Sequence, residues 1–86
     1  MVENEIKNAM KSGKLIIGSK SVLKGIKRDE VKYVIYATNC KEEIVDMLKF
    51  YNKNFGLEIK KFNGNSRRLG EICGKPFNIM VLGIKK

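Results

Sequence analysis

The stretch IIGSKSVLKGIKR, residues 16–28, leads from a strand into a basic helix. An apolar run ends at a Gly-Ser pair, and a segment rich in lysine follows without an acidic residue. Apolar residues at helical spacing predict a helix after the short buried strand of residues 15–17. One face of that helix is apolar: Val22, Leu23 and Ile26. Another face is basic: Lys20, Lys24, Lys27 and Arg28.

Helices and strands alternate along the whole chain. Helical spacing predicts further helices at residues 3–12, 39–55 and 66–73, and apolar runs predict strands at residues 31–37, 57–62 and 77–84. Ser19 or Ser21 suits the N-cap of the second helix, and Asn39 with Glu42 resembles a capping box before the third. This alternation favours a mostly parallel sheet with helices on both faces. Binding sites then lie beyond the carboxyl ends of the strands, where three junctions gather: residues 18–21, 38–40 and 64–66.

Composition narrows the class of protein. The 86 residues suffice for one domain, residues 1–86, and a net charge of +9 predicts a polyanionic partner. The open alternative is a solvated, lysine-rich surface. No apolar run reaches the roughly 20 residues of a membrane span. Residues 1–14 also lack the apolar segment of a signal peptide, so we expect a cytoplasmic protein without membrane contact.

The cysteine and histidine content argues against an enzyme. Cys40 and Cys73 stand far apart in the sequence, and there is no histidine. The common zinc sites and the Ser-His or Cys-His nucleophile pairs are therefore excluded. Residues 13–21 approach the P-loop pattern, but a serine precedes the lysine and the apolar run would be strand. We predict no enzymatic activity, no metal and no cofactor.

Three places remain as candidates for binding an anion or a base. The amides and lysines at the start of the second helix favour phosphates, against a solvated helix face as the alternative. Asn39 is either a helix cap or a reader of a base edge. Phe77, after Lys75 and Pro76, is either the first core residue of the last strand or a loop aromatic that stacks on an unpaired base. Arg67 and Arg68 open the last helix, where the helix dipole disfavours cations, which weakly suggests an external anion.

Several short motifs, in this order, resemble one known family. They are Ser12-Gly13-Lys14, residues 18–24 (GSKSVLK), Ala37-Thr38-Asn39, Phe62-Asn63-Gly64, Leu69-Gly70 and residues 74–77 (GKPF). With this spacing the chain resembles the large-subunit ribosomal protein family L-thirty-e, of the kink-turn RNA-binding superfamily that includes L-seven-Ae. The resemblance covers nearly the whole chain. It departs from the L-seven-Ae branch at Lys20-Ser21, where that branch has Asn-Glu.

The resemblance implies both a fold and a function. The fold is an α/β/α three-layer sandwich around a four-stranded mixed sheet. The function is non-enzymatic binding of a kink-turn-like internal loop of ribosomal RNA, by a protein of the large subunit that is monomeric when free. The implied RNA-binding residues are Gly18, Ser19, Lys20, Ser21, Lys24, Lys27, Arg28, Asn39, Lys75, Pro76 and Phe77. Two alternatives stay open: a kink-turn binder of another ribonucleoprotein, and a protein-interaction module of the same fold.

Overall fold

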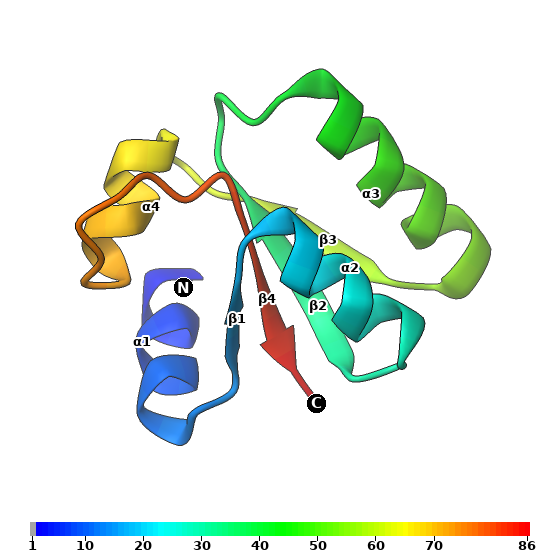
Figure 1. Ribbon diagram of the computed structural model, residues 1–86, viewed down its shortest axis with the longest axis horizontal. Helices are drawn as coiled ribbons and strands as arrows, with labels where there is room; N and C mark the ends of the chain where they lie inside the picture. The colour runs from blue at the N-terminus through cyan, green and yellow to red at the C-terminus, as the bar shows by residue number, and fades with distance from the viewer. Residues whose placement is uncertain (1) are drawn as a thin grey trace.

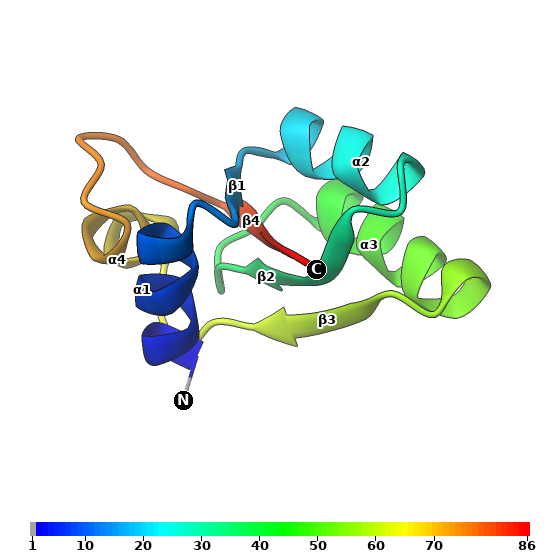
Figure 2. The same cartoon turned by 90° about the horizontal axis from the view of Figure 1, so that it is seen from below.

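The computed structural model describes residues 2–86, which form four helices and four strands in alternation. In chain order these are α1 (Val2–Ser12), β1 (Leu15–Ile17), α2 (Ser19–Lys27), β2 (Val31–Tyr36), α3 (Glu42–Phe55), β3 (Glu58–Lys61), α4 (Ser66–Ile72) and β4 (Val81–Lys85). The helices α1 and α4 cover one face of the sheet, and α2 and α3 cover the other (Figures 1 and 2). The three-layer α/β/α arrangement is therefore confirmed. No helix within residues 2–86 has the length and apolar character needed to cross a membrane.

The sheet has the strand order β1-β4-β2-β3, and it is mixed. Only β2 and β3 pair in parallel, because β4 lies between β1 and β2 and runs antiparallel to both. The mixed sheet implied by the family resemblance is confirmed, and the mostly parallel sheet expected from the alternation is wrong. The loop after α4 gives the reason: residues 73–80 turn back over that helix, with the Phe77 backbone against Gly70, instead of continuing to the far end of the sheet. The chain therefore enters β4 at the end of the sheet where the other strands finish.

The last strand is shorter than predicted. We expected a strand over residues 77–84, but residues 77–80 form a loop and β4 begins at Val81. The apolar character of the loop comes partly from Ile79, which is buried in the core although it is not in a strand. Its amide donates to the carbonyl oxygen of Ser66 at 3.0 Å, instead of to a neighbouring strand.

Two apolar cores lie on opposite faces of the sheet, and a β-bulge in β2 places Val31 and Tyr33 in different cores. Val31 pairs with Lys85 and Tyr33 with Ile84, so Lys32 is an extra residue on its strand. Val31 consequently packs toward α2 and α3, whereas Tyr33 packs toward α1 and α4. Without the bulge both side chains would point to the same face.

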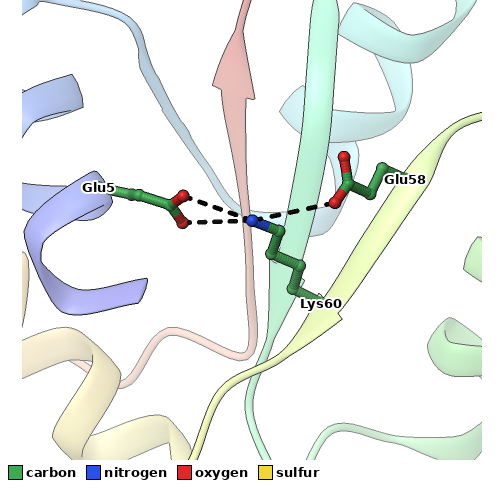
Figure 3. A network of polar contacts seen from close by, with 3 residues as sticks. All are labelled: Glu5, Glu58 and Lys60. Atoms are coloured by element: carbon green, nitrogen blue, oxygen red, sulfur yellow. Dashed lines mark hydrogen bonds and ion pairs between the residues drawn. The ribbon is translucent and has the colours of Figure 1, made fainter. Parts of the chain in front are cut away.

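A polar cluster joins α1 to the sheet (Figure 3). The Lys60 ammonium lies 3.4 Å from a Glu5 carboxylate oxygen and 3.8 Å from one of Glu58. The same nitrogen lies 4.5 Å from the centre of the Tyr33 ring. Burial first, and then the Glu5 carboxylate, raises the pKa of Tyr33 to about 12. The phenol therefore stays neutral over the physiological range.

Candidate nucleic-acid interface

Three junctions predicted to gather at one end of the sheet do so. The Gly18 amide donates to the Val81 carbonyl oxygen at 3.1 Å, which joins the end of β1 to the start of β4. The Thr38 amide and hydroxyl both donate to the Gly64 carbonyl oxygen at 2.9 Å, which joins the ends of β2 and β3. The Ala37 amide donates to the Met80 carbonyl oxygen at 2.8 Å, which joins the end of β2 to the loop before β4. Backbone hydrogen bonds therefore fix the relative positions of these loops.

The helix α2 starts at this end, and its cap is Gly18. A φ of 96° at Gly18 favours glycine, and no side chain caps the helix. The predicted cap at Ser19 or Ser21 is wrong, because the strand carries the chain directly into the helix at Gly18. The first amides of α2 have no acceptor within the helix and no acidic side chain in the first turn. They remain available to an anion.

The basic residues of α2 are exposed and uncompensated. No carboxylate within residues 2–86 forms an ion pair with any of the four. They are Lys20, Lys24, Lys27 and Arg28, all exposed to solvent. The opposite side of the helix is fixed in the core by Val22, and Gly25 faces Val31. The predicted division of α2 into an apolar and a basic face is confirmed.

Asn39 is not the cap of α3. Lys41 occupies the cap position without a side-chain hydrogen bond. The Asn39 Oδ1 instead accepts from the Ser66 amide at 2.8 Å, and its Nδ2 donates to the Ser66 Oγ at 3.0 Å. Ser66 is only 2% exposed, so Asn39 satisfies polar groups at the buried start of α4. One N–H of the exposed Asn39 amide group is left for an external acceptor.

The loop after α4 is held against that helix by Gly70. A Cβ atom at Gly70 would lie 2.1 Å from the Phe77 carbonyl oxygen, so only glycine permits this crossing. The Lys75 amide also donates to the Gly70 carbonyl oxygen at 3.0 Å. Phe77 is 54% exposed in this loop, and its interpretation as a core residue is wrong. Lys75 and Pro76 are exposed beside it.

Two cavities flank this loop, and the sequence predicts neither of them. A cavity of about 240 Å³ has Ile17 on one side and Cys73 and Lys75 on the other, so it connects the loop to the free edge of β1. A second, of about 220 Å³, is lined by Lys75, Pro76 and Phe77 together with α4. Ile17 lines the first cavity from the edge strand β1, but nothing in the sequence distinguishes it from other strand residues.

Arg67 and Arg68 do not need an external anion. Arg67 lies 3.6 Å from the Glu71 carboxylate, and Arg68 lies 3.6 Å from the same carboxylate and 4.0 Å from that of Glu3. These carboxylates explain two cations in the first turn of α4. Both cysteines are free thiols, and burial raises the pKa of Cys40 and of Cys73.

The profile of the Ribosomal protein L7Ae/L30e/S12e/Gadd45 family matches residues 1–86. The chain belongs to this family. The large ribosomal subunit protein eL30 of Archaeoglobus fulgidus is 41% identical over 83 residues, which cover 96% of this chain and 92% of that protein. The eL30 protein of Methanocaldococcus jannaschii is 35% identical over 81 residues, covering 94% of this chain and 74% of that one. The predicted family resemblance is confirmed.

Solved structures of distant sequence share the fold. A Giardia lamblia 15.5 kD RNA-binding protein aligns with a TM-score of 0.87 at 24% identity, over 99% of this chain and 71% of its own. A Bacillus halodurans protein of unknown function aligns with a TM-score of 0.88 at 23% identity, over 98% and 83%. The arrangement of helices and sheet is therefore kept across large changes in sequence.

Proposed function

We propose that this chain is a non-enzymatic component of the large ribosomal subunit that binds a kink-turn-like internal loop of ribosomal RNA. One observation carries the proposal: the exposed, unpaired cations of α2 start at the sheet end where the amides of α2 are free. The family and the eL30 names of its relatives support the ribosomal assignment. Residues 1–86 would act as one RNA-binding domain, in the cytoplasm and bound to the ribosome.

The α2 surface suits the RNA backbone. Lys20 and Lys24 stand one helical turn apart, and Lys27 follows at the end of α2, so the three follow one line along the helix. A row of ammonium groups neutralises successive phosphates and releases their counterions. Free amides at Ser19 and Ser21 add hydrogen bonds to the first phosphate, where the helix dipole also attracts an anion. Phosphate contacts of this kind position an RNA without reading its sequence.

Recognition of an internal loop needs a surface for unstacked bases. The loop of residues 74–78 offers Pro76 and the exposed ring of Phe77, next to the Lys75 cation. A base that leaves the stack loses its stacking contacts with neighbouring bases, and packing on an aromatic ring restores part of that stabilisation. Asn39 is bound to Ser66 at the start of α4, the helix against which this loop packs, and its free N–H can meet a base acceptor. A plain duplex presents no such bases.

Two substitutions separate backbone binding from base recognition. The probes are an RNA hairpin with a kinked internal loop and a fully paired hairpin of the same length. Lys24→Ala should lower the magnitude of the log–log salt slope by up to about one unit on both RNAs. Lys49→Ala, at an exposed lysine of α3, is the matched control and should leave the slope unchanged.

Phe77→Ala should weaken binding of the internal-loop hairpin by about tenfold to a hundredfold, since one base–aromatic contact contributes roughly 1–3 kcal/mol. Binding of the paired hairpin should not change. Phe50→Ala is the control, because Phe50 is equally exposed but lies on α3. A salt slope near zero for the unmodified protein would refute RNA binding and favour the protein-interaction alternative. Equal losses in the two Phe variants would remove Phe77 from the site.

A further inference from the structure

A second group of lysines lies at the opposite end of the sheet from the proposed internal-loop site. Lys14 precedes β1, Lys32 is the bulged residue near the start of β2, and Lys85 ends β4. In Figure 1 these strand ends lie at the lower end of the sheet, whereas α2 starts from the upper end of β1. The residues of β4 from Val81 to Lys85 separate the two ends by about 13 Å.

The backbone brings these three lysines together. Gly13 ends α1 with a φ of 68°, and the amides of Gly13 and Lys14 return to the carbonyl oxygens of Met10 and Ala9 at 3.3 and 2.8 Å. This is the Schellman arrangement, and it directs the chain away from α1 at Lys14. The Lys85 amide then donates to the Lys14 carbonyl oxygen at 2.8 Å. The Ser12-Gly13-Lys14 motif thus ends α1 and places Lys14 beside Lys85, which is a role separate from the internal-loop site.

The β-bulge adds the third lysine. Because the bulge inserts Lys32 between Val31 and Tyr33, those two residues enter opposite cores and Lys32 stays exposed. Bulges often redirect a side chain in this way. Lys32 then lies beside Lys85 on the neighbouring strand, and the two line one cavity.

That cavity has the chemistry of a phosphate-binding surface. It is open, has a volume of about 310 Å³, and is lined by Lys14, Lys32 and Lys85 with the polar side chains of Asn8 and Ser12. A carboxylate, that of Glu5, also lines the cavity, but it forms an ion pair with Lys60. A fourth lysine, Lys86, is paired with Asp29 at 2.6 Å. The other three cations form no ion pair within residues 2–86, so each is available to an external anion.

We propose that Lys14, Lys32 and Lys85 bind the backbone of a second RNA segment, so that the protein holds two RNA segments at opposite ends of its sheet. The inference rests on the proposed RNA binding and extends it from one surface to two. Ammonium groups with neighbouring amide and hydroxyl donors suit phosphate oxygens, and such contacts carry no sequence preference. The second segment therefore needs only an RNA backbone of suitable shape.

A capture experiment tests this directly. The internal-loop hairpin is immobilised, the protein is bound to it, and a labelled RNA duplex of about 20 base pairs is added in solution. The unmodified protein should capture the duplex at 50 mM salt. Three phosphate contacts predict a salt slope of about 2.7, so capture should weaken about 40-fold between 50 and 200 mM salt.

Two triple variants give the comparison. Lys14→Gln/Lys32→Gln/Lys85→Gln should bind the immobilised hairpin like the unmodified protein but lose capture of the duplex. The matched control replaces three exposed lysines elsewhere: Lys7→Gln, Lys49→Gln and Lys53→Gln. It loses the same charge and should retain both activities. Circular dichroism and urea unfolding check that both variants are folded.

The outcomes separate this inference from the proposed function. Loss of capture only in the first variant supports a second RNA surface. No capture by the unmodified protein, or equal loss in both variants, would overturn it. Capture of a poly-glutamate peptide instead of the duplex would also overturn it, in favour of an acidic protein partner. If the hairpin itself does not bind, the proposed function fails. Binding of the plain duplex to the two free variants then still decides the role of this lysine group.

Discussion

Replacing Gly70 with alanine tests the packing that holds the candidate loop in place. The added Cβ would lie 2.1 Å from the carbonyl oxygen and 3.2 Å from the carbonyl carbon of Phe77. Since real Cβ atoms do not approach other atoms within 3.0 Å, the loop backbone must retreat by about 0.9 Å. The obstacle is backbone and cannot rotate away, as the end of a long side chain would.

The magnitude follows from two opposing contributions. Alanine in the interior of α4 gains roughly 0.5–1 kcal/mol over glycine through lower backbone entropy. Overpacking costs about 1–3 kcal/mol, and displacing the loop weakens the Lys75–Gly70 hydrogen bond by a further 0.5–1.5 kcal/mol or so. We therefore expect Gly70→Ala to lower the free energy of unfolding by about 2 kcal/mol, within a range of roughly 0.5–4 kcal/mol. For a chain of this size a loss of about 2 kcal/mol lowers the thermal midpoint by about 8–16 °C.

Urea unfolding followed by circular dichroism measures this change, and Gly83→Ala is the control. A Cβ at Gly83 meets only side-chain atoms, the nearest at 3.4 Å, so it fits without displacement of the backbone. Its free energy of unfolding should stay within about 0.5 kcal/mol of the unmodified protein. The reasoning is refuted if Gly70→Ala is as stable as the unmodified protein, or if both variants lose the same amount.

Two further substitutions test polar groups near the sheet. Asn39→Ala leaves the buried Ser66 amide unsatisfied and should lower the free energy of unfolding by about 1–3 kcal/mol in urea; an unchanged value would show that water replaces the Asn39 oxygen. Tyr33, whose pKa burial raises to about 12, keeps its proton when folded but loses it above pH 10 when unfolded. Stability should therefore fall between pH 10 and 12 relative to Tyr33→Phe, and parallel curves for the two proteins would contradict this.

The sequence predicted the elements of this fold better than their pairing. Helical and strand spacing placed all eight elements, and the three strands β1, β2 and β3 run in one direction as the alternation implied. The direction of β4 depended on where the chain returned after α4, which is set by the loop that crosses the helix at Gly70. Gly70 and Phe77 are close in sequence, but their contact depends on the course of the loop between them. The spacing of apolar residues does not predict such a contact.

The candidate site shows the same division. The basic face of α2 was predictable, because Lys20, Lys24 and Lys27 share a helical face whatever the sheet order. The role of Asn39 was not, because its partner Ser66 stands 27 residues away and only the pairing of β2 with β3 brings them together. Phe77 was ambiguous for a related reason: an apolar residue before a strand is either its first residue or part of the loop before it.

The position of β4 in the sheet determines what both ends of the molecule can bind. Because β4 runs antiparallel between β1 and β2, its preceding loop with Lys75 and Phe77 lies at the end where α2 begins. For the same reason Lys85 lies at the other end, beside Lys14 and Lys32. In the mostly parallel arrangement expected from the alternation, the loop of residues 74–78 and Lys85 would exchange ends of the sheet. Lys85 would then add to the α2 surface, and the loop would face away from it. The direction of this one strand therefore decides which of the two proposed RNA surfaces receives the loop of residues 74–78 and which receives Lys85.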